Sequence, residues 1–369
     1  MAGGNPLSFL HVSRAEIDLP PGTDPHSDEV YDRATENFAD LRARAPLVEE
    51  DVPAFYVYRL HMGAHTQTGV AACFSIDEYE AGIIKKHEKT RPDKEDDRTR
   101  HMLAIGAQTG PVLLTYTASP AIDALVERTA TAAPPLFDFT AADGVRHIIW
   151  PTTPADVDSV SQGFADVPAL YIADGHHRAA SAARTRRALA GRGAGEHDRV
   201  LAVAFPDNQM QILPYNRVVK DLNRQTAPEF LAALGRKITV VNDAAAVPPR
   251  PGMASMYLAG RWYGLDFGAA TADDPMASLD VSRLQDVVLA PMLGIHDVRT
   301  DKRIEFVGGI RGTAELERLV DSGAAAVTFS LRAVTVGDLM RIADAGGIMP
   351  PKSTWFEPKL RDGLLSHLV

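Results

Sequence analysis

Cysteine is nearly absent from this sequence, and so are long apolar runs. Cys73 is the single cysteine among 369 residues, which excludes an internal disulfide and fits a reducing compartment. It lies in the apolar run 70–74, so we interpret it as a small packing residue and not as a nucleophile. No apolar stretch is long enough to cross a bilayer, and the N-terminus lacks the basic and apolar parts of a secretory signal. These absences predict a cytoplasmic protein without membrane contact.

Basic residues are outnumbered by acidic ones. The chain has 38 Lys and Arg against 48 Asp and Glu, which gives a net charge of −10. This excess of acid argues against nucleic-acid binding by the surface as a whole, although a local basic groove is compatible with it. Hydrophobic residues at 45% and charged residues at 23% are ordinary for a folded protein. The length is sufficient for two or three domains.

Several motifs that would declare a chemistry are missing. The sequence has no metal-ligand pattern with zinc spacing, no G-x-x-x-x-G-K-[ST], no strand-linked G-x-G-x-x-G and no G-x-S-x-G. If phosphate binds this chain, a short glycine turn with cationic side chains has to hold it.

Helical and strand-like periodicities alternate along the whole chain, which predicts a mixed α/β (α+β) fold. We expect helices at 30–45, 77–86, 92–107, 179–190 and 335–345, single strands at 111–116, 145–150, 169–173 and 324–331, and hairpins that pair 54–61 with 67–76, 200–205 with 210–213, and 255–258 with 262–267. Changes in composition predict three segments, an N-terminal region at 1–224, an α/β domain at 225–348 and a C-terminal segment at 349–369. We expect the first to be the catalytic region, and the last to return to the candidate site described below.

The stretch 169–190 carries the strongest functional signal. A buried strand and an Ala- and Arg-rich helix flank the sequence Asp174-Gly175-His176-His177-Arg178. Gly175 permits a tight turn, and the helix that follows directs its first backbone N–H groups at whatever lies before it. With two His and one Arg added, this predicts an anion site. In the simpler alternative, Asp174 caps the helix and Arg178 is a surface charge.

Three further polar clusters stand out. His87 and Glu88 open a charged block in which Lys94 and Arg98, one helical turn apart, repel each other unless an anion bridges them; a solvated charge run is the alternative. The other two are Arg217 after a strand, and Lys352, Ser353 and Lys359 among prolines and aromatics, for which a C-terminal docking segment is the alternative. Because burying such groups unpaired is costly, we predict that all four clusters converge on one cleft around a shared anion.

Three motifs together carry a family resemblance: the run 174–178, the pattern His-Glu-x-Thr-x-Pro-x-Lys at 87–94, and the ending Pro-Pro-Lys-Ser-Thr-x-Phe-x-Pro-Lys-Leu at 350–360. With these, the chain resembles the bacterial family catalogued as domain of unknown function 1015, from Asn5 to the C-terminus. Members usually carry a few tens of residues before the equivalent of Asn5, including a Pro-Tyr-Asp segment. The absence of these residues implies either that the start site differs or that the active site lacks the part that these residues provide in other members.

The loop 175–178 is also similar to the G-x-H-R loop of the ParB and sulfiredoxin fold, which precedes a helix and receives nucleotide phosphates. That superfamily includes free-serine kinases. The resemblance implies a ParB/sulfiredoxin-like core with an additional C-terminal α/β domain. It implies that His177 and Arg178 hold phosphates and that Asp174 lies close to the reacting centre. His176 stands where sulfiredoxin has its cysteine, which argues against that redox chemistry.

The resulting hypothesis is a small-molecule phosphotransferase, most plausibly a kinase of free serine or a similar hydroxy acid that uses ATP or ADP with Mg²⁺. Asp174, Glu88 and His87 are the predicted catalytic residues, and Asp174 is the predicted metal ligand. The predicted cofactor-binding residues are Gly175, His176, His177, Arg178, Lys94, Arg98, Arg217, Lys352, Ser353 and Lys359.

Two alternatives use the same residues. One is a metal-dependent hydrolase or phosphatase with an ion held by His87, Glu88, Asp174, His176 and His177. The other is a non-catalytic, ParB-like nucleotide-binding regulator. The sequence leaves the oligomeric state open, including a homo-oligomer.

Overall fold

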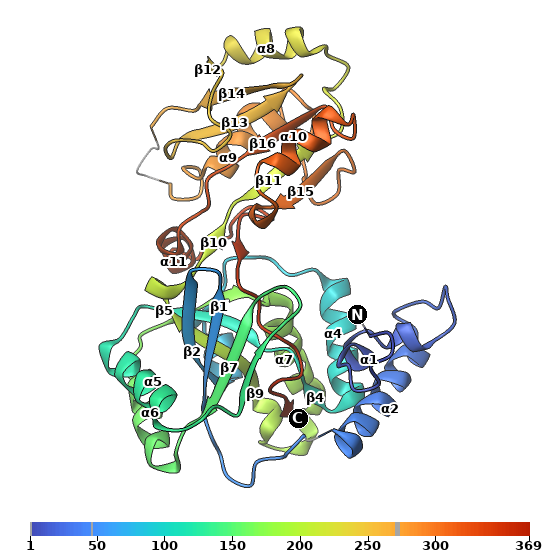
Figure 1. The fold of residues 1–369 in the computed structure, drawn as a ribbon, viewed down its shortest axis with the longest axis vertical. Coiled ribbons are helices and arrows are strands. Elements are labelled where there is room, and N and C mark those ends of the chain that lie inside the picture. The colour runs from blue at the N-terminus through green and yellow to red at the C-terminus, as the bar shows by residue number, and fades with distance from the viewer. Residues whose placement is uncertain (1, 46, 270–273) are drawn as a thin grey trace. The chain divides into compact units, whose positions relative to one another are not determined.

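The structure is a computed structural model that describes residues 2–45, 47–269 and 274–369. The chain divides into two compact units (Figure 1). The first consists of Met1–Met210 together with Pro358–Val369, and the second of Gln211–Glu357. The first unit is therefore discontinuous in sequence, and its last twelve residues follow the whole of the second unit.

A mixed sheet forms the centre of the first unit. In its described residues eight strands are ordered β3-β8-β5-β9-β2-β1-β7-β6. The pairs β3–β8 and β5–β9 are parallel, and the other pairs are antiparallel. These strands are β1 (Tyr56–Met62), β2 (His65–Ser75), β3 (Ile84–Lys85), β5 (Val112–Tyr116), β6 (Phe137–Thr140), β7 (Arg146–Pro151), β8 (Leu170–Asp174) and β9 (Arg199–Pro206).

Helices cover this sheet and extend the unit beyond it. They are α1 (Leu10–Ser13), α2 (Asp28–Arg44), α3 (Ile76–Ala81), α4 (Pro92–Ile105), α5 (Pro120–Ala132), α6 (Val157–Ala165) and α7 (His176–Leu189). Ala179, Ala182 and Ala183 of α7 are buried in the main core, where small side chains let the helix approach the strands closely. Fully burying an aliphatic side chain such as Ile172 of β8 contributes roughly 1.5–3 kcal/mol. This packing fixes the start of α7 against the end of β8.

The second unit has its own antiparallel sheet. Six strands of its described part are ordered β12-β14-β13-β16-β11-β15. They are β11 (Tyr215–Val219), β12 (Thr239–Asn242), β13 (Met253–Leu258), β14 (Arg261–Asp266), β15 (Ile304–Gly308) and β16 (Val327–Ser330). The helices are α8 (Ala227–Gly235), α9 (Asp280–Leu284), α10 (Ala314–Asp321) and α11 (Val336–Asp344). A separate two-stranded ribbon pairs β10 (Ile212–Leu213) with β17 (Trp355–Phe356).

The C-terminal segment is tied to the first unit by backbone pairing. Strand β18 (His367–Leu368) pairs antiparallel with β4 (Ala107–Gln108), and the N–H of Val369 donates to the carbonyl of Gly106. These bonds hold the segment beside the residues that precede β5.

Most predicted elements are confirmed, including the mixed α/β class, the hairpins β1–β2 and β13–β14, and the strand and helix that flank residues 174–178. The helix predicted at 77–86 is wrong in its cap and its end. The hydroxyl of Ser75 accepts the N–H of Glu78, and Gly82 ends the helix at φ 77°. Residues 84–85 can then enter the sheet as β3, parallel to β8.

The hairpin predicted from 200–205 and 210–213 is also wrong. Strand β10 pairs with β17, which lies more than a hundred residues later in the sequence. Helix α5 and strand β6 were not predicted. The predicted segments 1–224, 225–348 and 349–369 differ in their bounds from the two compact units, because β11 pairs with β15 and β16 while Pro358–Val369 joins the first unit.

Gly69 in β2 tests the close packing of the first sheet. An added Cβ would lie 2.4 Å from the Ala204 carbonyl oxygen and 2.8 Å from the Phe205 ring. We expect Gly69→Ala to lower the free energy of unfolding by roughly 1–3 kcal/mol, the usual cost of overpacking, as measured by urea denaturation. Gly191→Ala is the control, since its Cβ meets nothing within 4 Å. Equal unfolding midpoints for the two variants would contradict this account.

Candidate functional site

A left-handed turn at Gly175 joins β8 to α7. Gly175 has φ 95°, a conformation that costs a residue with a side chain roughly 1–2 kcal/mol. Its ideal Cβ position also lies 3.3 Å from the Cα of Val112 in the neighbouring strand β5. Helix α7 starts at the next residue, so its first N–H groups face the end of the strand. The predicted strand–glycine–helix geometry is therefore present.

Asp174 is paired with Lys359 of the C-terminal segment. The Lys359 ammonium donates to Oδ2 at 2.9 Å, and the Gly175 N–H donates to Oδ1 at 2.8 Å. The Asp174 side chain is 46% exposed, yet the protein around it removes enough water to favour the neutral acid. Desolvation is the largest single effect on this carboxyl, but the charge and the hydrogen bond of Lys359, the charge of Arg178 and the Gly175 N–H together outweigh it. They hold the pKa of Asp174 below its usual range. Asp174 is therefore an ionised carboxylate at neutral pH.

The segment 87–91 lies across the start of α7 and orients both histidines of the motif. The backbone N–H of His87 points at Nε2 of His176 over 3.4 Å, and that of Arg91 donates to Nε2 of His177 over 3.1 Å. A ring nitrogen that accepts an N–H bond carries the lone pair, so the proton of a neutral ring is on Nδ1. His177 thereby presents Nδ1–H as a donor, and Nδ1 of His176 lies 4.0 Å from a carboxylate oxygen of Glu88.

His87 and His176 are buried as a pair. Their exposed fractions are 2% and 4%, and the rings meet edge to face with centroids 4.4 Å apart. Burial lowers the pKa of His87 to about 4. Burial, and then the neighbouring His87, His177 and Lys86, hold the pKa of His176 well below its usual range. Both rings are therefore neutral at pH 7.

Arg178 lies at the rim of this loop with its side chain 31% exposed. Its guanidinium donates to the carbonyl of Pro111 at 3.2 Å and meets the carboxylate of Asp362 at 3.5 Å. Gly110 makes this approach possible, because a Cβ there would lie 2.7 Å from Asp362. The long contact to Asp362 leaves Arg178 able to exchange this partner for a stronger anion. Sequence analysis missed Gly110, Pro111 and Asp362, and no local pattern pointed to them.

The two predicted cations of α4, Lys94 and Arg98, contact the Gly175 turn less closely than Lys359 does. Lys94 and Arg98 are exposed. Desolvation is the main reason why the pKa of His177 lies below its usual value. The charge of nearby Arg98 lowers this pKa further, whereas the charge of Glu95 raises it. The structure thus brings together His87, Glu88, Asp174 to Arg178 and Lys359, with Arg98 nearby.

Arg217, Lys352 and Ser353 belong to the second unit. Arg217 is 2% exposed and stacks on the Phe306 ring at 5.3 Å, and burial lowers its pKa to about 9. Lys352 has φ 59° and lies over the Tyr215 ring at 5.8 Å. The hydroxyl of Ser353 donates to the carbonyl of Pro350. Convergence of these three residues with the Asp174 loop stays a prediction.

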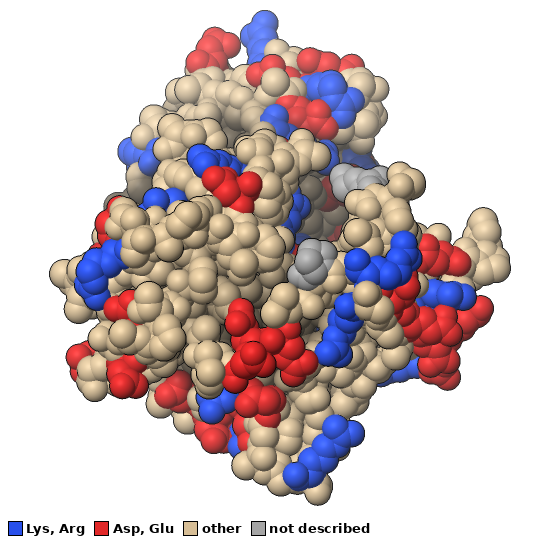
Figure 2. All heavy atoms as spheres, turned by 60° about the horizontal axis from the view of Figure 1, so that its bottom comes forward, with Lys and Arg blue, Asp and Glu red and all other residues tan. Residues whose placement is uncertain are grey.

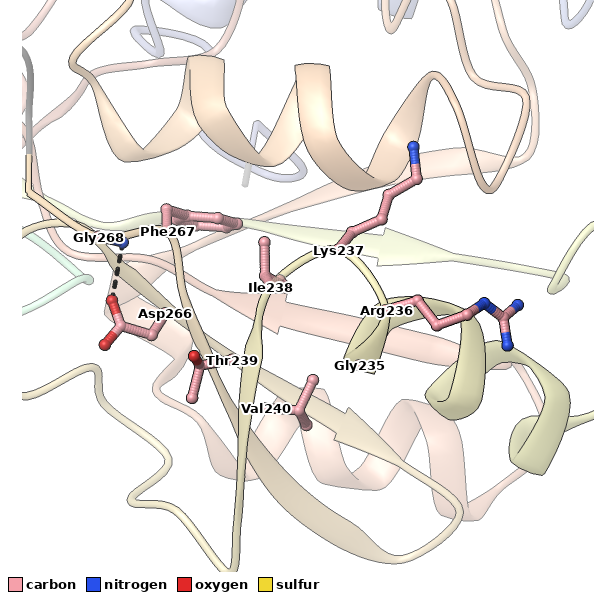
Figure 3. A pocket seen from close by; sticks show the side chains of 9 residues that line it. All are labelled: Gly235, Arg236, Lys237, Ile238, Thr239, Val240, Asp266, Phe267 and Gly268. Carbon is pink, nitrogen blue, oxygen red and sulfur yellow. Dashed lines mark hydrogen bonds between the residues drawn. The ribbon is translucent and has the colours of Figure 1, made fainter.

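A surface depression of about 680 Å³ lies elsewhere in the second unit, next to α8 and β12. Figure 3 shows Phe267 and Ile238 on one side of it and a hydrogen bond from the Gly268 N–H to Asp266. None of the predicted site residues lines it.

On the face drawn in Figure 2, Lys and Arg side chains are scattered, and Asp and Glu side chains gather near the centre of its lower half and at its right edge. Among the described residues, no helix has both the length and the hydropathy needed to cross a bilayer. Half-buried Cys73 is not an activated thiol, because burial raises its pKa to about 12.

These features define a mixed α/β protein with a polar site built on a strand–glycine–helix turn. A family model described as "Protein of unknown function (DUF1015)" matches residues 1–282. The chain belongs to this family, as the motifs at 87–94 and 174–178 had indicated. The motif at 350–360 lies beyond the matched residues, so the resemblance there stays a prediction. No curated protein matches the chain.

Solved structures with some similarity include a free serine kinase variant in complex with AMP. It is 14% identical, with a TM-score of 0.42, over 79% of this chain and 91% of that one. SbnI with a C-terminal truncation from Staphylococcus aureus is 12% identical, with a TM-score of 0.43, over 81% and 87%. A conserved hypothetical protein from Pyrococcus furiosus is 15% identical, with a TM-score of 0.39, over 79% and 93%. Similarity at this level does not bear on the activity of this chain.

The ion pair between Asp174 and Lys359 has a measurable consequence. Because the pKa of Asp174 is lower in the folded chain than in the unfolded one, the ionised group stabilises the fold at neutral pH, and this contribution is lost as the pH falls through the folded value. In Lys359→Met, Asp174 is still desolvated but has lost the charge and the hydrogen bond of Lys359, so we expect its pKa to rise. A carboxyl NMR titration measures it, with exposed Lys237→Met as the control. An unchanged pKa in Lys359→Met would show that the pair is not formed.

Proposed function

We propose that the chain is a small-molecule phosphotransferase that acts on the hydroxyl of free serine or a similar hydroxy acid. One observation carries this proposal: an ionised carboxylate, a lysine and the start of a fourteen-residue helix meet at the Gly175 turn. Phosphoryl transfer needs positioning and charge neutralisation more than it needs covalent help from the protein. The resemblance of the loop 175–178 to that of free-serine kinases supports the same reaction, phosphate transfer to a hydroxyl.

The phosphates of ATP or ADP would lie at the start of α7. The first N–H groups of the helix, beginning with that of His176, favour an anion at that end. His177 adds its Nδ1–H donor, and Arg178 offers a guanidinium suited to two parallel bonds. Exposed Lys94 and Arg98 of α4 would add positive charge.

The acceptor would lie next to Asp174 and Glu88. The hydroxyl oxygen attacks the terminal phosphorus, its proton passes to a carboxylate, and the nucleotide leaves one phosphate shorter, as ADP from ATP or AMP from ADP. We assign to Glu88 the role of proton acceptor. We assign to His87 a positioning role, since its ring packs against that of His176. Lys359 would neutralise the transferred group. Arg217, Lys352 and Ser353 stay predicted cofactor-binding residues.

A Mg²⁺ ion is the expected companion of the nucleotide, because it would neutralise part of the phosphate charge. The half-exposed carboxylate of Asp174 is the ligand type that Mg²⁺ prefers, although Lys359 already engages one of its oxygens.

Asp174→Asn separates binding from turnover. The amide keeps the size of the side chain but loses the charge that would hold a metal or accept a proton, so we expect nucleotide affinity to change little and turnover to fall at least about 100-fold. The assay is phosphate transfer from ATP, and separately from ADP, to a panel of hydroxy acids beginning with serine. Exposed Asp158→Asn is the control for a lost charge. Full turnover in Asp174→Asn would remove Asp174 from the reaction.

Arg178→Ala tests the phosphate site. The loss of two charge-assisted bonds should weaken nucleotide binding by roughly 10- to 100-fold, measured by calorimetry with ADP and Mg²⁺. Arg192→Ala, at an exposed position beyond α7, is the matched control. Equal affinities would place the nucleotide elsewhere. Wild-type protein that binds nucleotide and transfers nothing would indicate the regulator, and hydrolysis of phosphoesters that requires a transition metal would indicate the hydrolase.

A further inference from the structure

His87 has an unusual environment for a buried histidine. Its side chain is 2% exposed, and neither Nδ1 nor Nε2 has a hydrogen-bond partner among the described residues. The Ile172 backbone favours the protonated ring and so opposes the effect of burial on the pKa of His87, but its geometry falls short of a hydrogen bond to either nitrogen. A neutral imidazole has one N–H and one lone pair, and leaving both unsatisfied in the interior is costly. The polypeptide therefore provides a ligand atom that it does not use.

Two further donors lie next to this ring. His176, also buried, meets it edge on, and Glu88 lies 4.0 Å from Nδ1 of His176. One nitrogen from each ring and one carboxylate oxygen all lie within 4.8 Å of one another. In a tetrahedral site with metal–ligand distances of about 2.1 Å, the ligand atoms are about 3.4 Å apart. A movement of roughly 1–1.5 Å would therefore bring the three onto one ion, and half-exposed Glu88 can make much of it.

Two other candidate ligands of the region are already committed. Nε2 of His177 accepts the Arg91 N–H at 3.1 Å, and Asp174 is paired with Lys359 at 2.9 Å. His87, His176 and Glu88 supply two imidazoles and one carboxylate, a donor set that suits Zn²⁺, Mn²⁺ or Fe²⁺ rather than Mg²⁺. We infer that His87, His176 and Glu88 form a binding site for one divalent transition-metal ion, distinct from the predicted Mg²⁺ position at Asp174.

One contact opposes this arrangement. A His176 ring that coordinates through Nδ1 carries its proton on Nε2, which faces the backbone N–H of His87. That contact is 3.4 Å long, at the outer limit of a hydrogen bond. Its loss is small beside a metal–nitrogen bond. Three protein ligands also leave the ion an open position, as catalytic metal sites require, and Glu88 provides access from solvent.

The inference does not depend on the proposed phosphotransfer. If both hold, an ion at Glu88 would bind the acceptor hydroxyl and lower its pKa, and Glu88 would then act through the ion and not as a direct base.

Metal titration of the full chain tests the site. After treatment with a chelator, Co²⁺ is added as a spectroscopic probe, and Zn²⁺ is then used to displace it. We expect one Co²⁺ per chain, with the visible absorption of a four- or five-coordinate ion. Glu88→Gln and His87→Asn should each weaken binding at least about 100-fold. His101→Gln is the matched control, because this half-buried histidine in α4 bonds only the Val12 carbonyl among the described residues.

Three results would overturn the inference: wild-type protein without stoichiometric Co²⁺, affinity unchanged in Glu88→Gln, or equal losses in Glu88→Gln and His101→Gln. Glu88 is half-exposed, so its variant decides the matter even if His87→Asn fails to fold. Calorimetry of the metal-free chain with ATP and, separately, ADP, each with Mg²⁺, separates the two proposals. Nucleotide binding without Co²⁺ binding removes only the transition-metal site, and Co²⁺ binding without nucleotide binding removes only the phosphotransferase.

Discussion

The close approach of Gly175 to strand β5 is the constraint on which the rest of the site depends. A side chain at position 175 would be strained at φ 95°, and its Cβ would lie tightly, at 3.3 Å, against the Val112 backbone. This turn ends β8 and starts α7 within one residue. It thereby places Asp174 on one side and the two histidines on the other, so that a carboxylate, neutral rings and the start of a helix share a small volume.

Charge and burial are divided within that volume. Asp174 and Lys359 are half-exposed and compensate each other, while His87 and His176 are buried and neutral. The backbone of residues 87–91 sets the direction of both motif histidines through Nε2. Donors, acceptors and charges thus have fixed places before any ligand arrives, which is the condition for electrostatic stabilisation at low reorganisation cost.

The parts of the fold that local chemistry determines were predictable from the sequence. Gly175 between a β-rich run and an Ala-rich run predicted the turn, and two runs of alternating apolar residues predicted the hairpin of β1 and β2. Local chemistry failed where two signals competed. Ser75 and Asp77 are both good caps, and Gly82 ends the helix well before the predicted residue 86. Contacts between distant residues had no local signal at all, as the pairing of β10 with β17 and the contact of Asp362 with Arg178 show.

The discontinuity of the first unit bears on how the protein is made. Asp174 and Lys359 are 185 residues apart in sequence, and the whole second unit is synthesised between them. Domains generally fold from the N-terminus onward during translation. The sheet of the first unit can therefore form on the ribosome while β18 and Lys359 are still absent, and Asp174 then lacks its counter-charge. The pair forms only after the segment 358–369 has left the exit tunnel, so the nascent chain can form its sheet before Asp174 gains its counter-charge.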